Sequence, residues 1–189
     1  MDINSLLSTL LSNESVAGVA AKAGVKEKDV KNVLGSALPM LLNGANAQSA
    51  DSATADGFAG ALAQHAQSDT SDLAAFLKNV DKQDGAKIIS HLLGSEEKAQ
   101  TASVAKRAGV SSAKTGSILS SVAPLLMSLL GQQTASDANS GAGVSSLMGS
   151  LLGGGDVTSL IGGLLGGSGN SGQSGGLGGL GKLLSGLLK

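Results

Sequence analysis

The two histidines, His65 and His91, are the side chains of this sequence best suited to metal binding or proton transfer. They lie 26 residues apart, and the chain has no cysteine that could share a zinc ion with them. Further ligands would have to be Asp or Glu, but the segment ATADG at residues 53–57 lacks the alternating oxygen ligands of a calcium loop. We therefore expect both imidazoles on helix surfaces, with no bound metal and no other cofactor.

Serine and glycine are abundant, but their spacing matches no catalytic or phosphate-binding motif. No serine lies in a nucleophile elbow, and no Asp, His and Ser occur in an order that indicates a catalytic triad. The segment LLGGGDV lacks the GxxxxGK[ST] spacing of a phosphate-binding loop, and no predicted strand precedes it. The sequence therefore predicts no catalytic residues, no small-molecule substrate and a protein that is not an enzyme.

Basic residues in a repeated segment are candidates for DNA contact. The stretch VAAKAGVKEKDVKNVLGSALPMLL begins at Val19, and VAKRAGVSSAKTGSILSSVAPLLM begins 85 residues later at Val104. Nine of the 24 aligned positions are identical, so the chain contains an internal repeat. At the start of the second predicted helix of each copy, the residues that could reach DNA are Lys26, Lys28 and Lys114.

The order V-A-x-x-A-G-V followed by V-x-x-V-L resembles the helix-turn-helix of the lactose-repressor family. The matching residues would pack two helices together, and they are Val19, Ala20, Ala23, Gly24, Val25, Val30, Val33 and Leu34. Glu27 and Asp29 are interleaved with the candidate lysines and oppose the approach of phosphates. Residues 14–34 carry a net charge of only +1 and residues 96–119 of +2. The pattern therefore favours a packing unit, and DNA binding, weak and sensitive to salt, is the alternative.

Each copy is predicted to contain a short apolar helix, a second short helix, a glycine turn and a long helix. Gly24 and Gly109 fall where a helix ends through a left-handed residue. The long helix of the first copy has an apolar stripe of Val30, Val33, Leu34, Ala37, Leu38 and Leu41. The stripe of the second copy consists of Thr115, Ile118, Leu119, Val122, Ala123 and Leu126. Pro39 and Pro124 occupy equivalent positions in the two long helices. A proline inside a helix removes a backbone hydrogen bond, so we expect a bend in each.

These elements predict an all-α protein with a body at residues 1–133 and a tail at residues 134–189. The copies span about residues 5–44 and 88–131. An acidic connector at residues 45–87 carries two weaker helical patterns, near residues 58–66 and 73–80, with Asp and Ser in capping positions. The tail is rich in Gly, Ser and Leu, and we expect short apolar helices within it.

The duplicated pattern resembles the bacterial domain-of-unknown-function 937 family, which is related to the YidB-like proteins. The pattern is an apolar-doublet helix, then AxxAGV, then a long helix with the run ALPMLL or VAPLLM, and finally a Gly/Leu/Ser-rich tail. The resemblance covers about residues 1–133. It implies an all-helical fold of homeodomain-like units in a bacterial protein, and it implies no activity.

The tail carries candidate self-association residues. The last 50 residues hold 18 of the 29 glycines, yet they repeat an apolar doublet in LMGSLL, LIGGLL and KLLSGLL. The candidates are Leu160, Ile161, Leu164, Leu165, Leu183, Leu184, Leu187 and Leu188. We expect these motifs to pack on neighbouring copies of the chain or on the body, making an oligomer or polymer. Association with a membrane surface is the alternative, although only Lys182 and Lys189 would attract anionic lipid there.

Composition agrees with a self-associating, helical, cytoplasmic protein. The net charge is −1, which is too small to keep copies apart. Phe58 and Phe76 are the only aromatic residues, so the core must be built from Ala, Leu and Val. The absence of cysteine is compatible with a reducing compartment, and Asp2 stands where a secretory signal would carry positive charge. The sequence contains no stretch of 18 continuous apolar residues, so we expect no membrane-spanning helix.

Overall fold

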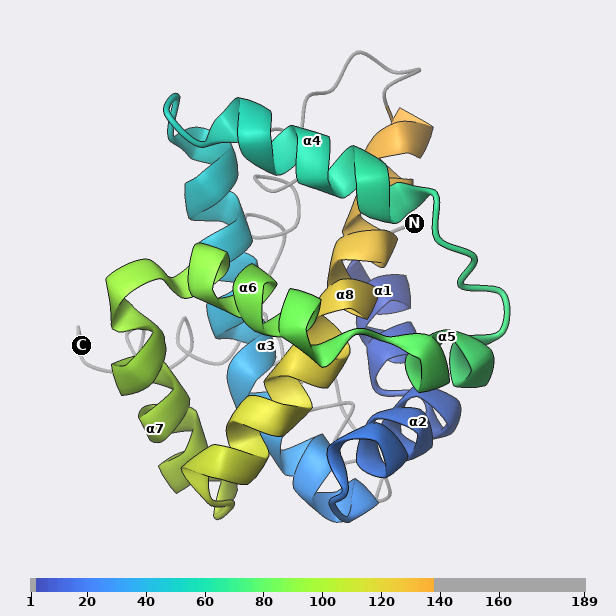
Figure 1. The fold of residues 1–189 in the computed structure, drawn as a ribbon, viewed down its shortest axis with the longest axis vertical. Coiled ribbons are helices and arrows are strands. Elements are labelled where there is room, and N and C mark those ends of the chain that lie inside the picture. Colours follow the sequence, from blue (N-terminus) through green and yellow to red (C-terminus); the bar gives the residue numbers. More distant parts are fainter. Residues whose placement is uncertain (1–2, 138–189) are drawn as a thin grey trace, which may run out of the picture.

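The computed structural model describes residues 3–137, including the side chains of residues 5–135. Every regular element in this part of the chain is a helix, so the predicted all-α fold is confirmed. Figure 1 shows their arrangement. In chain order they are α1 (Ile3–Leu10), α2 (Asn13–Ala23), α3 (Glu27–Ala50), α4 (Ala55–Ala66), α5 (Leu73–Asn79), α6 (Lys82–Leu93), the 3₁₀ turn η1 (Gly94–Glu96), α7 (Glu97–Ala108) and α8 (Ser112–Asp137).

Both copies contain a helix, a left-handed glycine and a long helix, as expected. Gly24 has φ of 71° at the end of α2, and Gly109 has φ of 68° at the end of α7. The amide of the following valine turns back in each case, with Val25 donating to the carbonyl of Ala20 and Val110 to that of Ala105, both at 3.0 Å. This geometry satisfies carbonyls that the end of a helix leaves without partners, and it sets the direction of α3 and α8.

The long helices extend beyond the residues expected for the two copies. α3 continues from residue 44 to Ala50, and α8 continues past residue 133 to Asp137. Each is a single helix through its proline, Pro39 or Pro124. A bend at each proline stays a prediction. In the connector, α4 and α5 lie where the two weaker patterns predicted them, and the carboxylate of Asp72 caps α5 by accepting from the amide of Ala75 at 2.9 Å.

The two copies pack on each other in a reciprocal way. α3 of the first copy contacts α7 of the second, and α8 of the second contacts α2 of the first. The side-chain amide of Asn32 donates to the carbonyl of Ala108 at 3.3 Å, while the hydroxyl of Ser117 donates to the carbonyl of Ala23 at 3.4 Å. Asn32 and Ser117 are equivalent residues of the two copies, 85 positions apart, and so are Ala23 and Ala108. Each long helix therefore binds the end of the other copy's short helix.

α8 is the central helix of the fold. All its residues from 121 to 131 are buried, and it contacts each of the helices α1 to α7. Figure 1 shows α4 and α6 crossing it. By length and composition alone, Ser112–Ala135 could cross a membrane, with a mean hydropathy of 1.3 over an 18-residue window, but 72% of that window is buried. The position of α8 in the core therefore accounts for its apolar character.

Glycines lie where helix backbones come closest together. A Cβ at Gly44 of α3 would meet the carbonyl oxygen of Leu92 in α6 at 2.5 Å. A Cβ at Gly85 would overlap the carbonyl oxygen of Ser120, where α6 crosses α8. Gly131 of α8 is in a similar position against the carbonyl oxygen of Leu62 in α4. These crossings bring backbone against backbone, which a residue with a side chain would prevent.

One buried hydroxyl breaks the pattern of the apolar stripe and leads to a stability prediction. Within the described part of the chain, Thr115 Oγ1 is buried and has no hydrogen-bond partner. The equivalent residue of the first copy, Val30, is also completely buried. We expect Thr115→Val to raise the free energy of unfolding by about 1 kcal/mol, because the change removes an unpaired buried hydroxyl and keeps the shape of the side chain. Urea denaturation of the full chain measures this change.

The reverse substitution, Val30→Thr, is the matched control for the Thr115 prediction. It introduces the same hydroxyl at the equivalent buried position, and we expect it to lower the free energy of unfolding by about 1–3 kcal/mol. If Thr115→Val lowered stability instead, the Thr115 hydroxyl would have to be making a favourable interaction.

Candidate functional site

The two histidines form no metal site with other residues of the described part of the chain. His65 lies on α4, and its Nε2 is 3.8 Å from a carboxylate oxygen of Asp84. His91 is exposed on α6. Between residues 3 and 137, no group of three or more His, Cys, Asp or Glu side chains is close enough to hold a metal ion. The histidines instead border two separate hollows of the surface.

The candidate DNA-contacting lysines lie at the starts of the two long helices. Lys26 is the N-cap residue of α3, Lys28 lies in its first turn, and Lys114 lies in the first turn of α8, all exposed. Glu27 and Asp29 share the first turn of α3, where carboxylates are favoured by the helix dipole. The helix starts are thus accessible to solvent.

The helix surface behind these lysines is engaged in packing. Asn32 and Ser117, one turn further along α3 and α8, bind the ends of α7 and α2, and α8 is buried throughout from residue 121. A recognition helix contacts base edges by placing one of its faces in the major groove. Between residues 112 and 134 of α8, only residues of the first turn are exposed. Lys114 therefore lies at the surface with no extended exposed face of α8 beyond it, whereas α3 keeps exposed residues such as Asn32 and Asn43 beyond Lys26 and Lys28.

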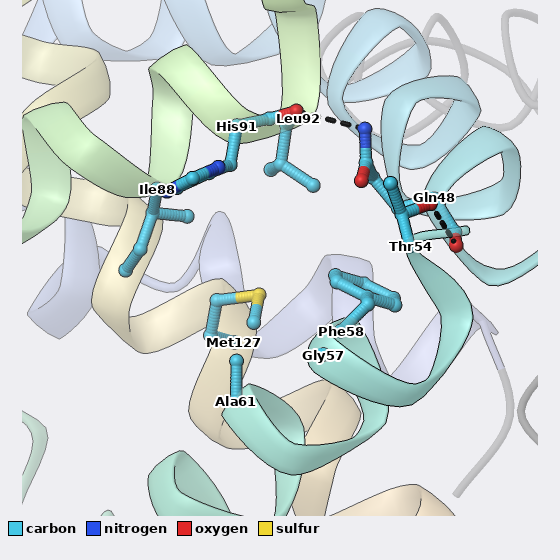
Figure 2. Close-up of a pocket in the computed structure, with 9 residues that line it drawn as sticks. All are labelled: Gln48, Thr54, Gly57, Phe58, Ala61, Ile88, His91, Leu92 and Met127. Carbon is cyan, nitrogen blue, oxygen red and sulfur yellow. Dashed lines mark hydrogen bonds between the residues drawn. The ribbon is translucent and has the colours of Figure 1, made fainter.

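A mainly apolar hollow of the surface lies between α3, α4, α6 and α8. We call it the apolar pocket; it has a volume of about 310 Å³, and Figure 2 shows its lining. Its apolar wall consists of Phe58, Ala61, Ile88, Leu92 and Met127. Its polar lining residues are Gln48, Thr54 and His91, with Gly57 completing the wall. A volume near 300 Å³ with mainly apolar walls and a few polar groups is typical of binding pockets.

Two hydrogen bonds fix the polar side of the apolar pocket. The side-chain amide of Gln48 donates to the carbonyl of His91 at 2.9 Å, which links the last turns of α3 and α6. The hydroxyl of Thr54 donates to the carbonyl of Gln48 at 2.9 Å, which holds the start of α4 against the end of α3. The carboxamide oxygen of Gln48 faces the hollow (Figure 2). The pocket therefore has a hydrogen-bond acceptor beside an apolar wall, without a carboxylate or an ammonium group in its lining.

Two other hollows have more polar linings. One, of about 450 Å³, lies between α3, α6 and α7 and includes Arg107 and Gln100. The other, of about 430 Å³, is lined by His65, Asp69 and Asp72. Hydrogen bonds from the side chain and then the backbone of Ser71 lower the pKa of the exposed Asp69 carboxyl. Both linings also contain apolar side chains, including Phe76 in the second hollow and Met40 in the first, so polar and apolar groups are mixed in them.

Sequence reasoning did not identify the apolar pocket. Its residues come from four helices, and Gln48 lies in a stretch of α3 where the apolar stripe has ended. The clearest available signal was Phe58, one of the two aromatic residues, at the start of a weak helical pattern. The eight candidate self-association residues of the tail, from Leu160 to Leu188, lie outside the described residues.

Comparison with known protein families identifies a match. The family model described as "Bacterial protein of unknown function (DUF937)" matches residues 5–133, which is more than half of the chain. No curated protein and no solved structure matches the sequence. The matched segment contains both copies and the connector between them, together with every residue of the apolar pocket.

Proposed function

This chain belongs to the DUF937 family of bacterial proteins of unknown function, and from that premise we propose that it is a non-catalytic cytoplasmic protein that self-associates through its Gly/Leu-rich tail. The observation that carries the proposal is that the helical body already encloses its own core. α8 is surrounded by the helices α1 to α7, and Leu125, Leu126 and Leu130 in its second half are almost fully buried. The described helices thus enclose a core of their own, and the tail adds further large apolar residues to the sequence.

The composition of the tail explains why its apolar residues need a partner. Three motifs, at residues 147–152, 160–165 and 183–188, contain twelve large apolar residues. They are separated by segments rich in glycine, and each Gly in a helix costs about 0.5–1 kcal/mol relative to Ala. Isolated helices shorter than about 12 residues are marginal in water. Motifs of this length are stabilised by packing against another surface, and the tails and bodies of other copies offer one.

Charge does not oppose this association. The chain has 13 basic and 14 acidic residues, for a net charge of −1. A small net charge gives little repulsion between copies at neutral pH. Small residues inside the second motif, Gly162 and Gly163, would let backbones approach closely between the rows of apolar side chains. The candidate contact residues of this assembly are those of the second and third motifs, Leu160, Ile161, Leu164, Leu165, Leu183, Leu184, Leu187 and Leu188.

Deleting residues 140–189 is expected to lower the assembly state and leave a helical protein. We expect the full chain to form oligomers or polymers at tens of micromolar, because the second and third tail motifs would be buried in contacts between copies. Size-exclusion chromatography with light scattering measures the mass of each species, and circular dichroism measures the helix content. A matched full-length variant keeps the length and the glycines of the tail but removes apolar contact residues. It carries Leu160→Ser, Leu164→Ser, Leu183→Ser and Leu187→Ser.

A monomeric full-length protein at these concentrations would contradict the proposal. Assembly that appeared only after addition of anionic lipid vesicles would support association with a membrane surface instead. Assembly that appeared only with duplex DNA, and was lost when Lys26, Lys28 and Lys114 were changed to Ala, would support the DNA alternative.

A further inference from the structure

We propose that the first tail motif, residues 147–152 with the sequence LMGSLL, docks in the apolar pocket of its own chain. The inference rests on the proposed function in one respect, that tail motifs are buried by packing. It assigns this motif a role different from that of the two later motifs, because it would fix the start of the tail on the body. The second and third motifs would then be presented to neighbouring copies.

The chemistry of the apolar pocket matches that of the motif. The pocket has a wall of five apolar side chains, and Figure 2 shows Phe58 and Met127 turned toward the hollow between them. The motif supplies Leu147, Met148, Leu151 and Leu152 and has no charged residue. The carboxamide oxygen of Gln48, which faces the hollow, can accept a hydrogen bond from a backbone amide of the bound segment. An uncharged apolar segment therefore fits this lining, whereas an ionic ligand would find no carboxylate or ammonium group of opposite charge there.

The length of the intervening chain favours the first motif. α8 lines the pocket through Met127 and ends ten residues later at Asp137, which is about 15 Å further along the helix axis. Nine residues, ANSGAGVSS at 138–146, connect α8 to the motif. A flexible chain of this length has an r.m.s. end-to-end distance of about 15–18 Å. The connection thus has about the length needed to return from the end of α8 to the pocket.

Intramolecular docking is favoured because the effective concentration of a tethered segment is highest when its linker matches the distance to be spanned, reaching the millimolar range. The second motif begins at residue 160 and the third at residue 183, so their connections are two to five times longer and dilute them near this pocket. A segment from another copy would compete only at similar millimolar concentrations.

Disulfide cross-linking in the full chain tests the proposal without background, because the natural sequence contains no cysteine. The test variant carries Ala61→Cys, on the wall of the pocket, and Ser150→Cys, inside the motif. The matched control carries Ala63→Cys with the same Ser150→Cys, because Ala63 is exposed on α4 and does not line the pocket. A disulfide needs Cα atoms within about 7 Å, so only a docked motif places the test pair in reach.

We expect the test pair to form a disulfide within one chain at least about ten times faster than the control pair during oxidation at low micromolar concentration. Non-reducing electrophoresis and intact mass distinguish links within a chain from links between chains. Adding Leu151→Asp and Leu152→Asp to the test pair should lower its rate to that of the control. These changes are in the tail, so thermal unfolding of the helical body reports whether they leave it intact.

Equal rates for the test and control pairs would overturn the inference, as would disulfides of the test pair that form only between chains. Light scattering on the natural sequence separates this result from the proposed function. Rapid cross-linking within a monomeric protein would support docking while overturning self-association. Assembly without preferential cross-linking at Ala61 would support self-association while overturning docking.

Discussion

Replacing Gly85 with alanine is expected to lower the free energy of unfolding by about 3 kcal/mol, at the upper end of the range for overpacked cores. Gly85 is buried where α6 crosses the central helix α8, and a Cβ there would overlap the carbonyl oxygen of Ser120. A backbone carbonyl inside a helix cannot rotate away as a flexible side chain could. The two helices would have to separate, and α8 would lose contacts with α6 along the crossing.

Gly116→Ala is the control for the Gly85 substitution. Gly116 lies near the start of α8 as Gly85 lies near the start of α6, but a Cβ at Gly116 would meet nothing within 4 Å. We expect this control to raise the free energy of unfolding by about 0.5–1 kcal/mol, because alanine favours the helix more than glycine does. Guanidinium denaturation of both variants measures the difference. Similar stability changes in the two variants would show that α6 and α8 do not approach as closely as described.

Replacing Leu119 with alanine is expected to lower the free energy of unfolding by about 2–5 kcal/mol. Leu119 is completely buried in α8, and its equivalent in the first copy, Leu34, is completely buried in α3. Removing three carbons, the Cγ methine and the two Cδ methyls, from either side chain loses transfer free energy and leaves a cavity. The two positions are a matched pair, since each belongs to the stripe of its own copy. We therefore expect Leu34→Ala to have a cost in the same range.

Chemical denaturation of the full chain measures the effect of Leu119→Ala, and Leu11→Ala is a suitable control because Leu11 is only partly buried at the edge of the core. The control should cost clearly less than either stripe substitution. A change below about 0.5 kcal/mol at Leu119 would mean that the apolar stripe of α8 had been placed on the wrong face.

The helices themselves were predictable from the sequence because their signals are local. Apolar residues at helical spacing placed both long helices, and the AGV sequence placed the left-handed turns at Gly24 and Gly109. The end of α3 was less predictable. Its stripe fades after Leu42, but alanine-rich residues continue the helix to Ala50, since alanine has the strongest helix preference of all residues.

The partners of the helices could not be predicted from the same signals. The stripe on α3 does not specify that α3 packs on α7, because any apolar helix face would satisfy it. No sequence pattern singled out Asn32 and Ser117, whose side chains join the two copies. The apolar pocket was missed for the same reason: Gln48, Phe58, Ile88 and Met127 become neighbours only after four helices have packed.

The reciprocal packing of the copies also determines when the chain can fold as it is synthesised. α3 contacts α7 and α8 of the second copy. These helices are equivalent to α2 and α3 of the first copy and follow them by 85 residues. At translation rates of about 5–20 residues per second, the ribosome needs about 4–17 s to add that length. During this interval α2 and α4 can already pack on α3, while α6, α7 and α8, which cover the rest of it, are still unmade. Part of the apolar stripe of α3 therefore stays uncovered until the second copy emerges.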